Sequence, residues 1–453
     1  MKPVYIVSWL FALAVSFVSC DDWLDKTPKD RLYPDVYFKT EDELRLFTNQ
    51  FYNNLVPSAV DIYSESSDLI VKSDLMLEMS GQRIIPDEGN GWNFTALRDI
   101  NFYLQYSHNC TEVNARNRYD GVARFFRAYF YFEKVKRYGD IPWYDKALDS
   151  DDPELYKARD SREFVMQKML EDLDFAIANL PKTKNAYVLT RWTALALKSR
   201  VCLFEGTFRK YHGLEDCEKY LNACVSASET FMNESGYTLY KSGSTPYRDL
   251  FASINLQAEE VIFGRDYEAS LSVLHNVQNY ENSTTMGRPG MNKKIVNSYL
   301  MADGSRFTDK AGYETMTFDQ ECQNRDPRLA QTIRTPGYTR IGSTKKEAPN
   351  LAYTMTGYHL IKYSMTANYD EYNKSCNDIP LFRTAEVHLN FAEAKAELGT
   401  LKQADINKSI KLLRDRVGMT NLDMELANSK PDTNFMSADT GNPNVKGANQ
   451  RVI

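Results

Sequence analysis

The sequence predicts a mainly α-helical protein in which helical hairpins form a scaffold that carries a long irregular insertion of loops and short strands. Three observations lead to this prediction. Many stretches repeat apolar residues at the spacing of an amphipathic helix. Some of these stretches form pairs joined by short links that contain glycine. Between the pairs, residues 233–380 are rich in Gly, Asn, Ser, Thr and Pro and show few helical periods.

The N-terminus is typical of an export signal followed by a lipid anchor. Residues 4–19 carry no charge, are shorter than the about 20 residues of a membrane-spanning helix, and fit the apolar part of a signal peptide. Ser19 is a small residue directly before Cys20, as in bacterial lipoproteins. We therefore expect residues 1–19 to be a lipoprotein signal peptide, Cys20 to carry the lipid, and residues 20–39 to be the lipidated tether and N-terminal segment. The alternative is an ordinary signal peptide followed by an incidental cysteine.

Three segments within the predicted scaffold, residues 40–232, combine helical periodicity with start or stop signals. Residues 40–55 begin at a threonine suited to an N-cap and have acidic residues in the first turn. Residues 120–138 place aromatic and aliphatic side chains on a broad stripe and stop before a glycine. Residues 161–180 begin at a serine and stop before a proline. The second and third segments are candidates for a hairpin.

Two further pairs of helices are predicted to be hairpins. Residues 190–205, which we expect Gly206 to end, precede a helix over 215–232. Residues 385–398 and 404–417 form a similar pair, and each ends before a glycine. The stretch FAEAKAELGTLKQA has the small-residue and Leu-Gly pattern of a tetratricopeptide hairpin. The scaffold is therefore expected to consist of tetratricopeptide-like hairpins that pack their apolar stripes on one another.

The other segments are irregular in sequence. Residues 233–380 are expected to be a variable, ligand-facing insertion, because long irregular segments on a rigid scaffold usually carry function. Residues 381–419 contain the predicted C-terminal hairpin. Residues 420–453 are polar and rich in turn-forming residues, so we expect a poorly ordered tail.

Composition excludes several classes of function. The formal net charge is −6 and no basic run occurs, which argues against nucleic acid as a partner. The histidines show no metal-ligand spacing, and no phosphate-binding loop or nucleophile motif occurs, so neither a metal, a cofactor nor a catalytic site is predicted. Six cysteines remain beside Cys20, and their spacing suggests no disulfide framework, so buried free thiols are expected.

Several stretches, in order over residues 20–419, resemble the SusD-like (RagB/SusD) family of outer-membrane nutrient-binding lipoproteins. The stretches are CDDWLDKTPKDRLYPDVYFKTEDEL, WNFTALRDINFYL, ARFFRAYFYFEKVKRYGDIPWY, LTRWTALALKSRVCLFEGTF, RDPRL and IPLFRTAEVHLNFAEAKAELG. The third is the most specific, because it joins an Arg-x-x-Arg-Ala aromatic helix to Tyr-Gly-Asp-Ile-Pro. One departure concerns the C-terminus: the family usually continues past RDRVGM into another helical segment, whereas here about 34 polar residues follow. The family C-terminus is thus expected to be missing, in a fragment, a truncated gene product or a divergent member.

The resemblance implies a lipoprotein exposed on the surface of the outer membrane that is not an enzyme. It would capture oligosaccharide nutrients, hold to the membrane by its lipid anchor, and pass the glycan to a TonB-dependent (SusC-like) transporter.

Candidate ligand-binding residues follow from this implied function. Sugar rings stack their apolar C–H faces on aromatic rings and need polar groups at their hydroxyls. The resemblance implies that Trp92 faces the ligand, and Arg98 and Asn101 follow on the same helix. Further candidates come from the insertion: Tyr267, Tyr280, Asn282 and Tyr299. For each residue the alternative is core packing or an unrelated surface. Trp143, Arg124 and Arg127 are expected to have structural roles.

Three other functions stay open. The first is a member of the same family that binds peptide. The second is a helical-repeat scaffold that binds only protein, although the signal peptide and the aromatic-rich insertion argue against it. The third is a surface glycosidase, which needs two carboxylates about 5–10 Å apart across a cleft. No motif nominates such a pair.

Overall fold

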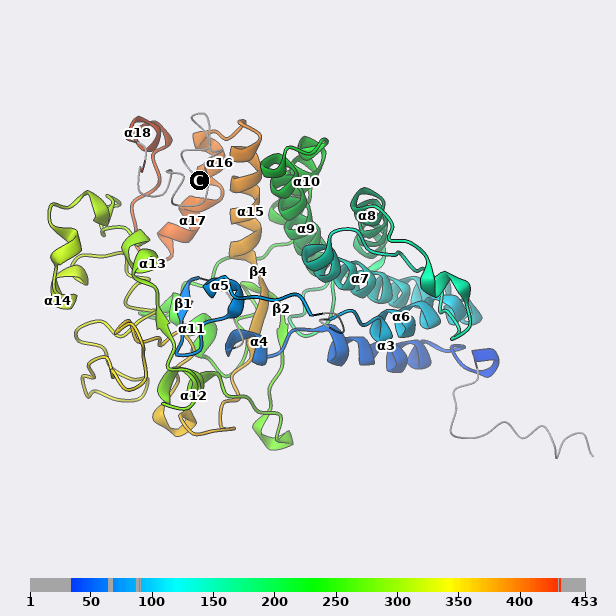
Figure 1. Ribbon diagram of the computed structural model, residues 1–453, viewed down its shortest axis with the longest axis horizontal. Coiled ribbons are helices and arrows are strands. Elements are labelled where there is room, and N and C mark those ends of the chain that lie inside the picture. The colour runs from blue at the N-terminus through cyan, green and yellow to red at the C-terminus, as the bar shows by residue number, and fades with distance from the viewer. Residues whose placement is uncertain (1–33, 64–67, 87–88, 90, 431, 433–453) are drawn as a thin grey trace, which may run out of the picture.

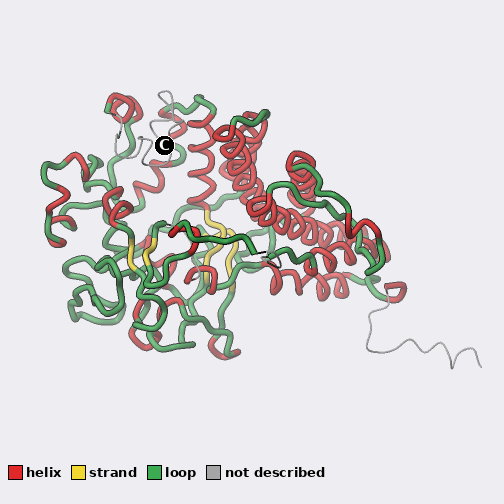
Figure 2. Tube along the Cα trace, viewed as in Figure 1, coloured by secondary structure: helices red, strands yellow, loops and turns green. Residues whose placement is uncertain are grey.

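The computed structural model describes residues 34–63, 68–86, 89, 91–430 and 432 (Figure 1). The predicted signal peptide, the lipidation site Cys20 and most of the predicted tail lie outside these residues. Helices predominate, and the strands of the described residues form only two small sheets (Figure 2). This confirms the predicted fold class.

Long helices form the scaffold on one side of the molecule (Figure 1). They are α3 (Glu41–Leu55), α6 (Thr95–Tyr106), α7 (Val113–Tyr138), α8 (Arg162–Asn179), α9 (Arg191–His212), α10 (Cys217–Glu234) and α15 (Thr384–Glu397). Both α3 and α6 pack on α7, and from there each helix packs on the next, α7 on α8, α8 on α9, α9 on α10 and α10 on α15. The predicted pairs α7–α8 and α9–α10 are therefore neighbours in the scaffold.

Short elements make up the rest. Those before α10 are η1 (Pro34–Val36), α4 (Val60–Tyr63), β1 (Ile70–Val71), α5 (Leu77–Ser80), η2 (Ser107–Asn109) and η3 (Pro153–Tyr156). Those of the insertion are α11 (Pro246–Ala252), β2 (Val261–Arg265), η4 (Ala269–Leu271), α12 (Val277–Asn282), β3 (Gly290–Met291), α13 (Lys293–Ser298), η5 (Phe307–Asp309), η6 (Tyr313–Thr315), α14 (Phe318–Glu321) and η7 (Ala367–Tyr369). Those near the C-terminus are β4 (Ile379–Arg383), α16 (Gln403–Asn407), α17 (Ile410–Asp415) and α18 (Met424–Ser429).

The starts of α3 and α8 follow the capping rules. Thr40 accepts a hydrogen bond from the Glu43 backbone N–H, and the Glu43 side chain accepts one from the Thr40 N–H, which completes a capping box. Ser161 caps α8 by accepting a hydrogen bond from the Phe164 N–H. Both N-caps are those predicted from the sequence.

Gly206 does not end α9, contrary to the prediction. The helix continues to His212, and Gly213, with φ +67°, provides the left-handed cap. A Cβ atom at Gly206 would lie 2.7 Å from Cγ of Leu221 on α10. Gly206 therefore permits the close approach of α9 and α10 and has no role as a stop signal.

The helix predicted over 404–417 is divided into α16 and α17. Ser409, between them, has φ −130° and ψ −90°, outside the helical region. Its hydroxyl is buried and donates a hydrogen bond to the Asp405 carbonyl at 2.6 Å.

The two sheets connect the insertion to the rest of the chain. Strands β2 and β4 pair antiparallel, with Val261 opposite Arg383 and Arg265 opposite Ile379. Strand β4 leads directly into α15, so this sheet joins the insertion to the scaffold (Figure 1). Strands β1 and β3 form the second antiparallel pair.

The largest hydrophobic cluster lies in the scaffold, around the aromatic face of α7. The insertion has smaller clusters of its own, one of them around Val296 and Ile333. All six described cysteines are free thiols; Cys110, Cys202, Cys224 and Cys376 are buried, whereas Cys217 and Cys322 are half-buried. Among the described helices, none has the length and hydropathy that a membrane span requires.

Candidate functional site

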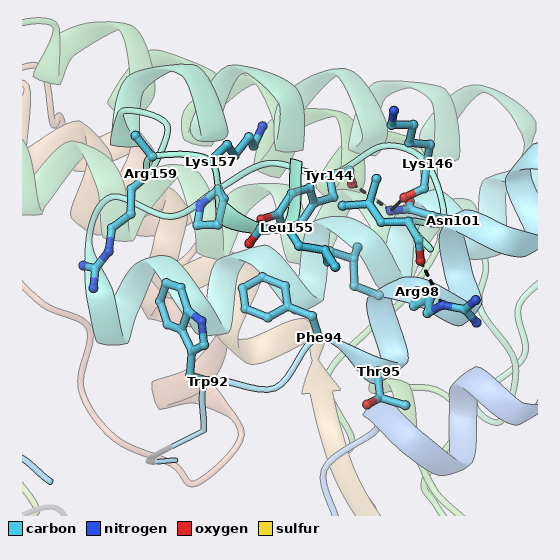
Figure 3. A pocket seen from close by; sticks show the side chains of 14 residues that line it. Trp92, Phe94, Thr95, Arg98, Asn101, Tyr144, Lys146, Leu155, Lys157 and Arg159 are labelled. Carbon is cyan, nitrogen blue, oxygen red and sulfur yellow. Dashed lines mark hydrogen bonds between the residues drawn. The ribbon is translucent and has the colours of Figure 1, made fainter. Parts of the chain in front are cut away.

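A pocket of about 540 Å³ lies where the N-terminal end of α6 meets the loop between α7 and α8 (Figure 3). We call it the Trp92 pocket. Its lining consists of Trp92, Phe94, Thr95, Leu97, Arg98, Asn101, Pro142, Tyr144, Lys146, Leu148, Leu155, Lys157, Ala158 and Arg159. The structure therefore brings three predicted site residues, Trp92, Arg98 and Asn101, to one cavity.

Aromatic rings form one wall of the Trp92 pocket. The Trp92 side chain is 40% exposed, and its ring makes edge-to-face contacts with Phe94 at 5.3 Å and Tyr138 at 4.9 Å between centroids. Phe94 in turn makes an edge-to-face contact with Tyr144 at 5.8 Å. These contacts support the indole while much of its surface stays open to solvent, as a stacking platform requires.

Asn101 fixes the opposite side of the pocket. Its Nδ2 donates hydrogen bonds to the backbone carbonyls of Tyr144 at 2.8 Å and Lys146 at 3.3 Å. Its Oδ1 accepts a hydrogen bond from Arg127 at 3.2 Å. Only 1% of Asn101 is exposed. Its polar atoms are therefore engaged in holding the loop, which makes Asn101 a positioning residue for the pocket.

Further contacts hold the α7–α8 loop in place, both to the scaffold and within the loop. The Tyr144 N–H donates a hydrogen bond to the Tyr131 hydroxyl at 2.6 Å, and the Trp143 N–H donates one to the Asp160 carboxylate at 2.7 Å. Trp143 is buried and stacks on Tyr131 with centroids 4.2 Å apart. This packing confirms the structural role expected for Trp143. Arg98 adds a bond from Nε to the Leu148 carbonyl at 3.3 Å.

Arg127 and Arg124 have structural roles, as expected. Arg127 is buried on α7 and forms a bidentate ion pair with Asp172 of α8. Burial lowers the pKa of Arg127, but the Asp172 carboxylate outweighs burial and the pKa is raised. The Arg124 guanidinium lies over the Phe175 ring at 4.1 Å and 3.8 Å from Asp172.

The four candidates from the insertion lie outside the Trp92 pocket and are mostly buried. The Tyr267 hydroxyl accepts a hydrogen bond from the Ala59 N–H at 2.8 Å, and Tyr280 is 3% exposed. Tyr299 packs against the hydrophobic cluster around Val296, and burial raises its pKa to about 12. These side chains hold the insertion together.

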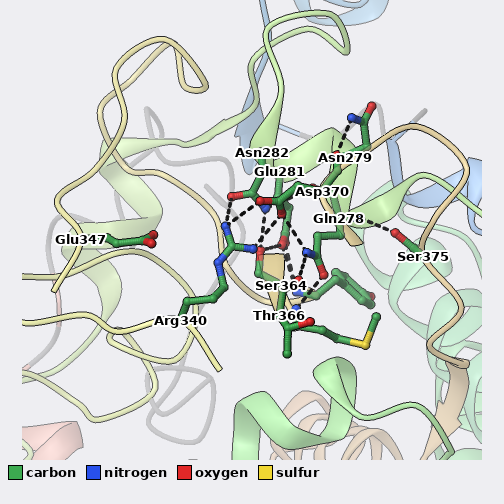
Figure 4. A network of polar contacts seen from close by, with 12 residues as sticks. Gln278, Asn279, Glu281, Asn282, Arg340, Glu347, Ser364, Thr366, Asp370 and Ser375 are labelled. Carbon is green, nitrogen blue, oxygen red and sulfur yellow. Dashed lines mark hydrogen bonds and ion pairs between the residues drawn. The ribbon is translucent and has the colours of Figure 1, made fainter. Parts of the chain in front are cut away.

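The fourth candidate, Asn282, belongs to a buried polar network (Figure 4). Its Oδ1 accepts hydrogen bonds from Arg334 at 2.8 Å and Arg340 at 3.0 Å, and its Nδ2 donates to Ser364 at 2.8 Å. Ser364 also donates to the neighbouring Glu281 carboxylate at 2.7 Å. Burial raises the pKa of Glu281 to about 7.

Much of the pocket lining comes from residues that the sequence did not nominate. Tyr144, Lys146, Lys157 and Arg159 all lie in the α7–α8 loop. The only signal for them is their position after the specific aromatic helix and its Tyr-Gly-Asp-Ile-Pro end. Among the described residues, no group of His, Cys, Asp and Glu side chains has the arrangement of a metal site.

Comparison with known proteins identifies relatives of the chain. The sequence model of the SusD family matches residues 250–444, and a second model, described as "Starch-binding associating with outer membrane", matches residues 82–191. SusD-like protein P2 of Formosa agariphila is 25% identical over 415 residues, which cover 85% of this chain and 76% of that protein.

Solved structures share the fold. A SusD-like protein from Bacteroides fragilis superposes with a TM-score of 0.70 at 20% identity and covers 94% of this chain and 88% of its own. A SusD-like carbohydrate-binding protein, also from Bacteroides fragilis, has a TM-score of 0.70 at 18% identity and covers 85% of this chain and 80% of its own.

Proposed function

The chain belongs to the SusD-like family, and from this membership we propose that it captures oligosaccharide nutrients in the Trp92 pocket and delivers them to a TonB-dependent (SusC-like) transporter. In this proposal the protein is a surface-exposed lipoprotein of the outer membrane, anchored through Cys20, and it does not transform its ligand.

The family supports the general part of this proposal. One matching family description names starch binding and association with the outer membrane. One solved structure of the same fold is that of a carbohydrate-binding protein. Glycan binding and an outer-membrane location are thus supported for the family. The lipid anchor, the exposure on the cell surface and the transporter partner are proposed in addition for this chain.

The observation that carries the proposal for this chain is the exposed Trp92 ring in a pocket that also holds polar groups. An indole that its neighbours support from the side can stack on the C–H face of a sugar ring. Arg98, Thr95 and Arg159 line the same cavity and carry hydrogen-bond donors for sugar hydroxyls. A mostly apolar concave site with a few polar groups is typical of small-ligand binding.

The lining of the pocket also favours binding over hydrolysis. A glycosidase needs two carboxyl groups on either side of the scissile bond. The described residues that line the Trp92 pocket include no Asp or Glu side chain. Capture without turnover therefore fits this cavity better than the glycosidase alternative.

A glycan-array and affinity-gel screen with residues 21–453 tests the proposal. We expect binding without product formation. The affinity of Trp92→Ala should be at least about ten-fold lower, since the stacking of a ligand ring on one aromatic side chain contributes on the order of 1–3 kcal/mol. Tyr156→Ala is the matched control, because Tyr156 is an 86% exposed aromatic residue of the α7–α8 loop and does not itself line the pocket.

Three results would contradict parts of the proposal. Release of shorter glycans would indicate an enzyme. Binding that survives in Trp92→Ala would place the ligand elsewhere. A folded protein that binds peptides and no glycan would indicate the peptide-binding alternative. Co-purification of the tagged protein with a TonB-dependent transporter from its native outer membrane tests the partner separately.

A further inference from the structure

The electrostatics of the Trp92 pocket differ from those of the whole chain. Four of its lining residues are cationic, namely Arg98, Lys146, Lys157 and Arg159, and none of its described lining residues is acidic. The chain as a whole has a formal net charge of −6. A local excess of cations on an acidic protein indicates that the pocket favours a negatively charged ligand.

Two of the four cations are neutralised by the protein itself. Lys146 lies 3.0 Å from Glu154, and Lys157 lies 2.9 Å from Asp160. These carboxylates do not line the pocket. The two lysines therefore attach the loop to itself and contribute little free charge to a ligand.

The two arginines keep their charge for a ligand. Arg98 donates from Nε to the Leu148 carbonyl, which leaves its terminal nitrogens without a carboxylate partner among the described residues. Arg159 is exposed, and its guanidinium lies over the Trp92 ring, 5.0 Å from the ring centroid. Asp99 follows Arg98 on α6 and feels its charge: burial raises the pKa of Asp99, and the Arg98 cation offsets part of that rise. Asp99 makes no ion pair with Arg98 among the described residues and does not line the pocket.

The arginines lie at different ends of the cavity. Figure 3 shows Arg159 beside Trp92 at one end and Arg98 at the other, with the rings of Phe94 and Tyr144 between them. Arg159 lies over part of the Trp92 ring. A sugar that stacked on the part of the indole that Arg159 leaves open would bring a carboxylate or sulfate group at its edge toward this guanidinium. The planar guanidinium fork suits both kinds of anion, because it can donate two parallel hydrogen bonds to their oxygens.

We infer that the Trp92 pocket binds an anionic oligosaccharide, one that carries carboxylate or sulfate groups, and that Arg98 and Arg159 recognise these groups. This inference rests on the proposed glycan-binding function and names its substrate class. The neutral aromatic wall would bind the sugar rings, and the two arginines would select for charge.

Matched pairs of hexasaccharides test the inference by isothermal titration calorimetry. The probes are κ-carrageenan, polygalacturonate and alginate hexasaccharides, each beside its desulfated or methyl-esterified form. We expect a charged member to bind at least about ten-fold more tightly than its neutral form, because a charge-assisted hydrogen bond is strong. Higher salt should reduce this preference. In Arg98→Gln/Arg159→Gln the two members should bind within about three-fold of each other.

The control is Lys345→Gln/Lys374→Gln, which removes the same number of positive charges from exposed sites of the insertion. It should leave the preference unchanged. If both double variants lost the preference for the charged hexasaccharide equally, the preference would come from the overall charge of the protein. This result would overturn the assignment to Arg98 and Arg159. Equal affinity for charged and neutral forms, or binding only of neutral glycans on the array, would overturn the inference and leave glycan capture standing. Failure of the folded protein to bind any glycan would overturn the proposed function as well.

Discussion

Arg127 of α7 and Asp172 of α8 form a buried bidentate ion pair, with nitrogen–oxygen distances of 2.6 and 2.7 Å. The remaining terminal nitrogen of Arg127 donates to Asn101, and Asn101 holds the backbone of the α7–α8 loop at Tyr144 and Lys146. The scaffold thereby fixes one wall of the Trp92 pocket through a chain of side-chain contacts. Substitutions at different points of this series of contacts should therefore affect stability and ligand binding to different extents.

Asp172→Asn should lower the free energy of unfolding by about 3–5 kcal/mol, because it leaves the buried Arg127 cation without a counter-charge. Urea denaturation followed by circular dichroism measures the change. Asp174→Asn on the same helix is the matched control. Asp174 is exposed and pairs with Lys198 at the surface, so its loss should cost less than about 1 kcal/mol. Similar effects of the two variants would contradict the role given to the buried pair.

Asn101→Ala should weaken glycan binding without removing any proposed ligand contact. The change leaves two loop carbonyls and one Arg127 nitrogen without their partner, which should cost about 1–3 kcal/mol of stability. Hydrogen exchange of the backbone amides around Tyr144 should become faster. Trp92→Ala is the comparison, since it should reduce affinity and leave the hydrogen exchange around Tyr144 unchanged. Unchanged affinity in Asn101→Ala would show that the loop position does not depend on Asn101.

Gly206→Ala should destabilise the protein although it places a better helix former inside α9. The added Cβ would lie 2.7 Å from Leu221 Cγ, and such overpacking costs about 1–3 kcal/mol, more than the about 1 kcal/mol gained in helix propensity. Gly121→Ala on α7 is the matched control, because there the nearest atom, Leu180 Cγ, lies at 3.3 Å. We expect Gly121→Ala to stay within about 1 kcal/mol of the parent. Thermal unfolding distinguishes the two, and a more stable Gly206→Ala would contradict the packing argument.

The helical scaffold could be predicted well because its signals are local. The cap at Thr40 and the glycine after α7 act through neighbouring residues, so sequence alone locates them. Gly206 shows where this fails. The same residue type serves a helix end or a close helix contact, and the choice between them depends on Leu221, a residue of the following helix. The break at Ser409 is another example, because no glycine or proline marks it in the sequence.

The candidate site could be predicted only in part for a related reason. Trp92, Arg98 and Asn101 lie close together in the sequence and share one cavity. Tyrosines in the insertion are suited to stacking on sugar rings, but the same aromatic side chains pack equally well in a hydrophobic core. Tyr267 is buried in a hydrophobic cluster that joins the insertion to Ala59, and Tyr280 is buried beside the ring of Tyr63. Periodicity does not reveal such clusters in a segment without long helices.

Two buried histidines of the insertion should make the protein sensitive to acid. His359 donates from Nε2 to the Glu281 carbonyl at 2.8 Å and accepts at Nδ1 from the Asn350 N–H. His275 donates from Nε2 to the Asn377 carbonyl at 2.8 Å and accepts at Nδ1 from the Val277 N–H. A second proton would break the Nδ1 contact in each ring. Burial lowers the pKa of His359 to about 3 and that of His275 to about 4.

The sign of the pH effect follows from these values. Both folded-state pKa values lie below the unfolded value of about 6.5, so the unfolded chain binds more protons as the pH falls below 6.5. The stability that each histidine contributes is complete above pH 6.5 and is lost as the pH falls toward 4. At pH 5 each of the two histidines should lower the free energy of unfolding by about 2 kcal/mol relative to its value above pH 6.5. Glu281 acts in the opposite direction, because its folded-state pKa of about 7 is raised and its ionisation destabilises the fold as the pH rises from about 4.5 to 7.

The variants His359→Gln and Glu281→Gln separate these contributions. His359→Gln should be less stable than the parent at pH 7, since it disturbs a buried hydrogen bond. Glu281→Gln should be more stable than the parent at pH 7, because its amide oxygen can still accept the Ser364 hydrogen bond and the buried negative charge is gone. Between pH 7 and pH 5, however, His359→Gln should lose about 2 kcal/mol less than the parent, whereas Glu281→Gln should lose about 2 kcal/mol more. Urea denaturation at both pH values measures these differences, and the exposed His108→Gln should follow the parent. Parallel pH profiles for all four proteins would show that the buried polar network does not govern the response to acid.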